Sequence, residues 1–350
     1  MNTYCRVFST PSFEELFFYI LHPTKMQVGT YFETWAMPWA AAASNDLSQI
    51  QAGINTVYLA FAQPDMTYKK GQNSFSGTGL EFSSDFQIIK SSILALQARG
   101  VKTFLSVGGG SYWSQSKQVN IQNIVDLCND LNCDGIDIDW EVGVSDDDAP
   151  GNVIANLKSA APSKLISFTC FSTGAFPING DTYQGMNLLA ISRQSKNIDQ
   201  INVMAYDAGA SFDAVAAFKA YRAIYTGHIN IGFEIGTQGW GNALLTLTQL
   251  QTVSKTVSSD PQSGCFFWAY YSKANSPAVD RQTAVSAAVA IFTKTTAPLP
   301  PPPTAPLPPP PTAPLPAPPT KPTYSVPSSV LILCPNCKHK IKSAWYDGEA

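Results

Sequence analysis

The chain has 350 residues, of which 13% are charged and 45% hydrophobic, and its formal net charge is −3. Its 22 basic residues do not outnumber its 25 acidic ones, which argues against a nucleic-acid-binding protein with a basic surface. The sequence has no run of 18 or more apolar residues, which argues against a membrane span. The hydrophobic content is sufficient for one large, well-packed domain.

The first 25 residues do not resemble a secretory signal. Their apolar piece, Leu16–Leu21, is short, follows Glu14 and Glu15 directly, and is stopped by His22 and Pro23. We expect residues 1–25 to be an extension outside the functional domain. The sequence identifies no compartment, and extracellular action stays compatible with it.

Buried strands alternate with helices between residues 26 and 295. The strands are predicted at Gln27–Glu33, Ile54–Phe61, Val101–Val107, Gly135–Asp139, Leu165–Phe171, Ile201–Tyr206, Ile229–Phe233 and Cys265–Tyr270. Helical segments are predicted around 44–52, from a cap at Ser83 or Ser84 to Gly100, over 121–128, over 213–225, and from Ser276-Pro277 onward. Eight such strands predict a (β/α)8 TIM barrel. A doubly wound open sheet is the alternative, but the glycine-rich fingerprint of its dinucleotide-binding form is missing after the first strand.

A proline-rich repeat follows the predicted barrel. The octet Thr296–Pro303 recurs unchanged at 304–311 and with one Pro replaced by Ala at 312–319. Such a sequence favours extended polyproline II, so residues 296–323 are predicted to be a stiff linker. Residues 324–350 then form a small C-terminal segment, a candidate for metal or carbohydrate binding.

This C-terminal segment contains Cys334, Cys337 and His339, which give half the spacing of a zinc site. No second cysteine pair lies nearby, so we expect no metal and no cofactor. Trp345 and Tyr346 are candidates for stacking on a polysaccharide. The seven cysteines of the whole chain are too sparse for a disulfide scaffold.

The sharpest chemical feature is the segment Asp134–Glu141, with the sequence DGIDIDWE. Because side chains alternate along a strand, Asp137, Asp139 and Glu141 share one face, which points into a barrel. Like charges at this spacing raise the pKa of at least one carboxyl group, as a general acid requires. Glu141 comes last and is therefore expected at the C-terminal mouth of the barrel, where active sites lie.

This octet resembles the signature of glycoside hydrolase family 18, the chitinases and related enzymes. Other segments resemble further motifs of that family in the same order: Gly29–Phe32 with Trp35, Ser106–Gly109, Met204–Asp207, and Trp268. The resemblance covers about residues 27–293. It implies a retaining, substrate-assisted chitinase, in which the 2-acetamido oxygen of the sugar attacks its own anomeric carbon.

The resemblance also implies roles for individual residues. Glu141 would protonate the leaving oxygen, Asp139 would stabilise the oxazolinium ion, and Asp137 would share a proton with Asp139. Tyr206 would hold the acetamido carbonyl. The implied substrate-binding residues are Asp207, Trp268, Met204, Tyr31, Trp35, Gly108 and Gly109.

Five further aromatic or acidic positions remain open. Four aromatic residues follow strands one, three and seven and are candidates for binding sugar, although one or two of them could simply cap the barrel: Trp39, Tyr112, Trp113 and Trp240. Glu234, at the end of strand seven, either contacts substrate or forms an ion pair. Only 27 residues, 237–263, lie between strands seven and eight, so the α+β insertion of larger chitinases is expected to be absent. That shorter connection implies an open cleft and internal, endo-type cutting.

Two alternatives to a chitinase that binds chitin or chitooligosaccharides remain. The first is an endo-β-N-acetylglucosaminidase acting on N-glycans, although such relatives often carry Asn where this chain has Asp207. The second is a non-catalytic chitin-binding protein, which the presence of Glu141 argues against. We expect a monomer with no nucleic-acid or membrane partner.

Overall fold

The computed structural model describes residues 26–113, 118–142, 149–178, 183–208, 212–236, 244–273 and 278–293. All of them belong to the first of two units, Met1–Pro298; the second is Leu299–Ala350. The predicted N-terminal extension, the proline-rich linker and the C-terminal segment with Cys334, Cys337 and His339 therefore lie outside the described residues.

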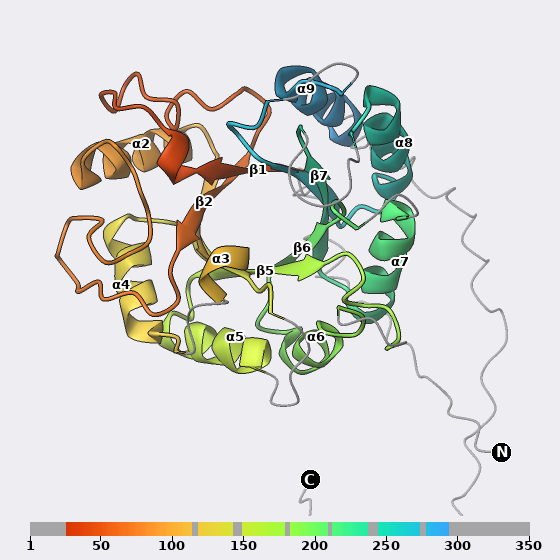
Figure 1. Cartoon of the computed structure of the whole chain (residues 1–350), viewed down its shortest axis with the longest axis horizontal. Helices are drawn as coiled ribbons and strands as arrows, with labels where there is room; N and C mark the ends of the chain where they lie inside the picture. Colours follow the sequence, from red (N-terminus) through yellow and green to blue (C-terminus); the bar gives the residue numbers. More distant parts are fainter. Residues whose placement is uncertain are drawn as a thin grey trace, which may run out of the picture. The chain divides into compact units, whose positions relative to one another are not determined.

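Eight parallel strands close into a barrel in the order of the sequence (Figure 1). They are β1 (Gln27–Glu33), β2 (Thr56–Ala62), β3 (Lys102–Gly108), β4 (Gly135–Asp139), β5 (Leu165–Phe171), β6 (Gln200–Met204), β7 (His228–Glu234) and β8 (Ser263–Trp268). The pairing of β1 with β8, from Gln27↔Gly264 to Thr30↔Phe267, completes the ring. This architecture confirms the predicted TIM barrel, and each predicted strand end lies within two residues of the observed one.

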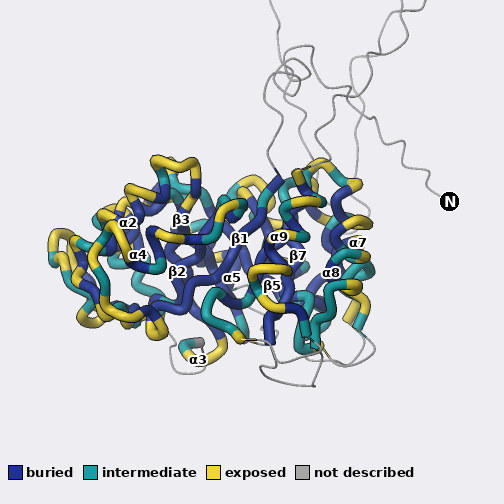
Figure 2. The backbone as a smooth tube through the Cα atoms, turned by 90° about the horizontal axis from the view of Figure 1, so that it is seen from above, coloured by how far each residue is buried: buried dark blue, intermediate teal, exposed yellow. Residues whose placement is uncertain are grey.

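Helices surround the barrel, while the strands at the centre are almost wholly buried (Figures 1 and 2). The helices are η1 (Thr34–Ala36), α2 (Phe86–Ala98), α3 (Gly110–Trp113), α4 (Ile121–Asp130), α5 (Ala149–Ala160), α6 (Leu188–Gln194), α7 (Ala214–Ile224), α8 (Leu247–Val257) and α9 (Arg281–Phe292). The short α3 follows the end of β3 and lies at the C-terminal mouth of the barrel. None of the described helices is long and apolar enough to cross a membrane.

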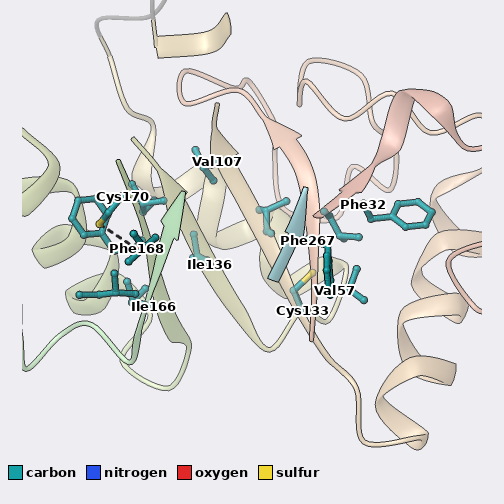
Figure 3. Close-up of a cluster of buried hydrophobic side chains, with 14 of the residues drawn as sticks. Phe32, Val57, Val107, Cys133, Ile136, Ile166, Phe168, Cys170 and Phe267 are labelled. Atoms are coloured by element: carbon teal, nitrogen blue, oxygen red, sulfur yellow. Dashed lines mark hydrogen bonds between the residues drawn. The ribbon is translucent and has the colours of Figure 1, made fainter. Parts of the chain in front are cut away.

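The alternation of side chains along the strands divides the core into two layers. Outward-facing residues such as Val107, Ile136 and Ile166 pack between the strands and the helices, as Figure 3 shows. A smaller aromatic cluster that includes Tyr31, Tyr58 and Phe266 packs inside the barrel, next to buried polar side chains. Each strand is therefore buried on both faces, as expected for a parallel sheet covered by helices.

The predicted helix over residues 44–52 is wrong, because this stretch forms turns. Asn45 explains the difference. Its side-chain oxygen accepts from the Ser48 backbone N–H at 2.9 Å, and its amide donates to Ser92 at 2.7 Å. Side chains that bond nearby backbone compete with helix formation.

Two predicted helix starts are also wrong. The structure places the N-cap of α2 at Asp85, while the Ser83 and Ser84 hydroxyls donate to the backbone of Met37 and Ala40. The last helix, α9, has its N-cap at Asp280 and begins at Arg281, whereas Ser276 and Pro277 lie outside the described residues. In both cases aspartate takes the N-cap position, but only Asp280 caps with its side chain, which accepts from the Thr283 backbone N–H.

The connection between β7 and β8 is short. Among its described residues, 235–236 and 244–262, the only regular element is helix α8. No α+β insertion is present in that described part, in agreement with the expected fold.

Candidate active site

The acidic side chains of β4 form a column that climbs toward the mouth of the barrel. Asp137 is fully buried and Asp139 is 3% exposed, whereas Glu141, two residues beyond the strand end, is half-buried. Their neighbours Ile136, Ile138 and Trp140 belong to the outer hydrophobic layer. The two-residue period of the strand thus separates an acidic interior from an apolar exterior.

Three hydroxyl groups surround the Asp137 carboxyl group. Ser106 on β3 donates to Oδ2 at 2.7 Å, Tyr31 on β1 donates to Oδ2 at 2.9 Å, and Thr169 on β5 donates to Oδ1 at 2.9 Å. The strand registers place Ser106 directly beside Asp137, and Thr169 beside Asp139. These donors compensate for the desolvation of a carboxyl group that is buried in the barrel.

Different neighbours set the pKa values of the upper two acids, Asp139 and Glu141. Burial, Glu141 and Asp137 all hold the pKa of Asp139 well above its usual value. Burial and the nearby Asp207 raise the pKa of Glu141, while the Gly110 backbone N–H, which donates to its carboxylate, opposes the rise. Raised values keep a carboxyl group protonated at higher pH and therefore able to act as an acid.

A cleft of about 530 Å³ opens above this column at the carboxyl ends of the strands. Residues at the ends of β1, β2, β3, β4, β6 and β8, or in the connections that follow these strands, line it: Trp35, Phe61, Gly79, Glu81, Gly108, Gly109, Gly110, Ser111, Tyr112, Asp139, Glu141, Met204, Tyr206, Asp207 and Trp268. Active sites of TIM barrels occupy this end of the fold. The cleft therefore joins the upper two acids to a surface that a ligand can reach.

Aromatic rings line one side of the cleft as a stacked row. Trp268 stacks on Phe61 with ring centroids 5.6 Å apart, and Phe61 stacks on Trp35 at 6.3 Å. Trp35 is 48% exposed, so its indole is open to a ligand. Broad aromatic faces next to carboxyl groups suit an elongated ligand with apolar and hydroxyl faces, such as a sugar chain.

Two consecutive glycines let the backbone turn from β3 into the cleft. Gly108 and Gly109 have φ angles of +116° and +75°, which L side chains rarely adopt. A Cβ at Gly109 would also lie 3.0 Å from the Phe61 ring. This turn brings the N–H of Gly110 to Glu141 and fixes that side chain at the rim.

Tyr206 lies across the cleft from the acid column. It follows β6 by two residues and meets Phe266 edge-on at 6.2 Å. Gly232 on β7 leaves the space for this ring, because a Cβ there would lie 2.8 Å from Tyr206 Cε1. The next residue, Asp207, has a φ of +51° and lines the same cleft.

Ten of the residues singled out in the sequence line the cleft together. Asp137 and Tyr31 lie beneath it, hydrogen-bonded to each other, and Tyr31 is only 1% exposed. Trp39 is 64% exposed and is not among the lining residues, and Glu234 is buried at the end of β7. The side chain of Trp113, and all of Trp240, lie outside what the structure describes.

Five lining residues escaped the sequence analysis: Phe61, Gly79, Glu81, Gly110 and Ser111. Phe61 ends a predicted strand, and this position at the barrel mouth is the signal that could have found it. Glu81 lies in the long connection between β2 and α2, where only the folded loop brings it to the cleft.

Among the described residues, no three histidine, cysteine, aspartate or glutamate side chains are arranged so that they could hold a metal ion.

This fold and cleft are those of a (β/α)8-barrel enzyme with its carboxyl groups at the C-terminal ends of the strands. A family model described as "Glycosyl hydrolases family 18" matches residues 27–280. The chain therefore belongs to glycosyl hydrolase family 18, which makes it a glycoside hydrolase by class. The family predicted from the sequence motifs is confirmed.

Two curated fungal proteins resemble parts of the chain. "Chitinase 1" of Aphanocladium album is 31% identical over 154 residues, which cover 39% of this chain and 33% of the relative. "Endochitinase 1" of Metarhizium robertsii is 27% identical over 194 residues, which cover 50% and 44%. The chain thus spans between a third and a half of the length of these curated relatives.

Solved structures share the fold at low sequence identity. A chitinase of the same family from Pseudoalteromonas aurantia aligns with a TM-score of 0.53 and 18% identity over 75% of this chain and 99% of that one. A fungal endo-β-N-acetylglucosaminidase of the family gives 0.54 and 15% over 77% and 97%. The catalytic domain of a chitinase from Pyrococcus furiosus gives 0.55 and 16% over 77% and 96%. At this identity the likeness establishes the barrel alone.

Proposed function

We propose that this chain is a chitinase that hydrolyses β-1,4 linkages between N-acetylglucosamine units by a retaining, substrate-assisted reaction. The observation that carries the proposal is the column of Asp137, Asp139 and Glu141, which opens into a cleft lined by Tyr206 and Trp268. The names of the fungal relatives support the same substrate class.

In the proposed first step, the protonated Glu141 gives its proton to the glycosidic oxygen as the bond to the anomeric carbon breaks. The acetamido oxygen of the same sugar forms a new bond to that carbon, which gives an oxazolinium ion. Asp139 hydrogen-bonds the acetamido N–H and stabilises the positive charge, while Tyr206 holds the carbonyl. Asp207 and Trp268 bind the distorted sugar.

In the second step, Glu141 is a carboxylate and takes a proton from a water molecule. The water attacks the anomeric carbon from the face that the leaving group vacated, and the acetamido oxygen departs. The configuration at the anomeric carbon is retained, and Glu141 is protonated again. The raised pKa of Glu141, which burial causes, suits both halves of this cycle.

The Glu141→Gln variant tests the assignment. With a fluorescent chitotriose glycoside as substrate, we expect hydrolysis to fall by roughly 10²–10⁴-fold, because a positioned general acid and base contributes about that much. Binding of chitooligosaccharide should persist, since the amide keeps the shape of the side chain. Asp126→Asn on the outer helix α4 is the matched control, and cellotetraose, which lacks the acetamido group, should not be cleaved.

Equal rates for the wild type and Glu141→Gln would rule out the assigned acid. Turnover of cellotetraose would contradict substrate assistance. Cleavage of an N-glycan core in preference to chitotriose would favour the endo-β-N-acetylglucosaminidase alternative. A fungal enzyme with that name has the same fold. Tight chitin binding without any turnover would favour a binding protein.

Products from chitin hexamer test the endo-type cutting that the open cleft suggests. The short connection between β7 and β8 supplies no insertion in its described part to wall the cleft. We therefore expect dimers, trimers and tetramers to appear together from the start, with new reducing ends in the β configuration. Chromatography and early-time NMR would show this, whereas dimers released alone, or α-anomers, would contradict the proposal.

A further inference from the structure

The interior of the barrel below the cleft is polar. Thr169 on β5, Asn202 on β6 and Asn230 on β7 are adjacent in the strand registers, and all three are buried. TIM-barrel interiors are more often filled by branched apolar residues. A buried amide that lacked partners would be costly, so this layer is expected to carry a specific set of hydrogen bonds.

The Asn202 amide uses all of its hydrogen-bonding capacity within this layer. Its oxygen accepts from the Tyr58 hydroxyl at 3.1 Å and from Asn230 Nδ2 at 2.9 Å. Its nitrogen donates to the hydroxyls of Ser167 at 3.0 Å and Thr169 at 3.2 Å. Two acceptor and two donor positions are thereby filled, which is the full inventory of an amide side chain.

The surroundings fix the direction in which this amide faces. Tyr58 accepts hydrogen bonds from the side-chain amides of Gln27 and Gln200, both at 2.6 Å. Its single proton is therefore left to donate to the Asn202 oxygen. With the oxygen on that side, the nitrogen of Asn202 must face Thr169.

The orientation of the Asn202 amide affects the hydrogen bonds that Asp137 receives. Because the Asn202 amide donates to the Thr169 hydroxyl oxygen, the proton of that hydroxyl faces away from Asn202, toward Asp137 Oδ1 at 2.9 Å and the Tyr31 hydroxyl at 2.6 Å. A hydrogen bond donated to a carboxylate favours its charged form. The Tyr31 hydroxyl also lies 2.9 Å from Asp137 Oδ2 and has a single proton. When Tyr31 donates that proton to Thr169, both acceptor positions of the Thr169 oxygen are filled, and the Thr169 proton goes to Asp137 Oδ1.

We propose that Asn202 and Thr169 are positioning residues for the reaction: the Asn202 amide directs the Thr169 hydroxyl proton to Asp137, which keeps Asp137 an ionised acceptor and leaves the shared proton on Asp139. The inference rests on the proposed function, because it assigns a use to that proton. Neither residue lines the cleft, so both act through Asp137.

The influences on the pKa values of Asp137 and Asp139 agree with an ionised Asp137 and a protonated Asp139. Burial raises the pKa of Asp137, but the three hydroxyl donors described above and the Ser167 hydroxyl lower it. Burial and two neighbouring carboxyl groups raise the pKa of Asp139. The other titratable groups that act on Asp137 are Tyr31 on β1, Tyr58 on β2 and Cys170 on β5. Burial raises the pKa of all three, so they stay neutral while the carboxyl groups titrate.

The Thr169→Val variant removes the hydroxyl and keeps the shape of the side chain. We expect the pKa of Asp137 to rise by roughly one unit, because a hydrogen bond to a charged group is lost. The acid limb of the kcat–pH profile on the chitotriose glycoside should move up by a similar amount, and KM should change less than about twofold. Thr169→Ser should restore the wild-type profile, and Asn202→Ala should shift it the same way by a smaller amount. Thr256→Val, at an exposed position on α8, is the control.

A carboxyl titration that does not depend on activity separates this inference from the proposed function. The chain is labelled with carbon-13 at the aspartate carboxyl, and the Asp137 signal is assigned with Asp137→Asn. A wild type without turnover would overturn the chitinase proposal, while the titration would still test the link from Thr169 to Asp137. An unchanged Asp137 titration in both Thr169→Val and Asn202→Ala, or a Thr169→Ser variant that behaves like Thr169→Val, would overturn the inference.

Discussion

At the scale of single residues, the acids of β4 are distinguished by depth rather than by type. Asp137 lies at the bottom among hydroxyl donors, Asp139 is buried between two carboxyl groups, and Glu141 reaches the cleft. In the proposed mechanism, β4 and the two residues after it thereby supply an ionised acceptor, a carboxyl group that keeps the shared proton, and a general acid at the rim, all within five residues. Pairs of carboxyl groups whose environments push their pKa values apart can divide acid and base roles in this way.

Gly232 is predicted to matter for catalysis without touching substrate. In Gly232→Ala the new Cβ would lie 2.5 Å from Phe266 Cζ and 2.8 Å from Tyr206 Cε1, so the Tyr206 ring must move. We expect kcat/KM on the chitotriose glycoside to fall about 100-fold, as a 1 Å misplacement of a catalytic group can do. Thermal unfolding should show a loss of about 1–3 kcal/mol from overpacking.

A double-mutant cycle with Tyr206→Phe identifies the route of this effect. If Gly232→Ala acts by moving the Tyr206 hydroxyl, the double variant should lose little more activity than Tyr206→Phe alone. Fully additive losses would show that the glycine acts elsewhere.

The acid column could be predicted from the sequence because the two-residue period of a strand determines which side chains share a face. Asp137, Asp139 and Glu141 follow that period inside an otherwise apolar strand. The hydrogen bonds that Asn202 and Thr169 make below the cleft could not be predicted. These residues approach Asp137 only through the register of three neighbouring strands, β4, β5 and β6. Glu81 could not be predicted for a related reason, since its position depends on the path of a long loop.

At the scale of elements, side-chain caps decide where several helices begin. Asp213 caps α7, Asp280 caps α9, and Thr246 with Gln249 forms a capping box on α8. The segment over 213–225 was predictable because its cap and its apolar spacing agree. The stretch over 44–52 was not, because Asn45 and Ser48 bond to the backbone locally and to α2, which no local pattern reveals.

The Asp213→Ala variant tests the cap of α7. Asp213 Oδ1 accepts from the backbone N–H groups of Val215 at 2.9 Å and Ala216 at 3.1 Å. We expect a loss of about 1 kcal/mol in the free energy of unfolding, which corresponds to about 2–4 °C in Tm. Calorimetry would measure it.

The matched variant Asp213→Asn should keep most of this stability, because asparagine caps helices about as well as aspartate. If Asp213→Asn lost as much as Asp213→Ala, the negative charge near the helix N-terminus, rather than the cap hydrogen bond, would be responsible.

At the scale of the whole molecule, the family match and the closed barrel coincide. The match spans residues 27–280, and the ring closes between β1, which begins at Gln27, and β8, which ends at Trp268. Helix α9 then packs on the barrel and ends at Phe292, which is fully buried. All helices and strands of the described part therefore lie between Gln27 and Phe292.

A chain shortened to residues 26–295 is predicted to keep the barrel and its chemistry. No strand or helix of the described part lies beyond Phe292. We therefore expect the Tm to stay within a few degrees, and the kcat/KM on chitin hexamer within about twofold, of the values for the 350-residue chain. Calorimetry and the hexamer assay would measure both. A large loss of either would mean that residues outside the barrel support it.

Insoluble chitin separates the barrel from the segment at residues 324–350. If Trp345 and Tyr346 stack on polysaccharide, the shortened chain should bind chitin particles more weakly than the full chain while it cleaves the hexamer equally well. The full-length variant Trp345→Ala with Tyr346→Ala should reproduce that loss, since it keeps the proline-rich repeat and removes only the two rings. Particle binding that is equal in all three proteins would leave the aromatic row of Trp35, Phe61 and Trp268 as the surface that holds the polymer.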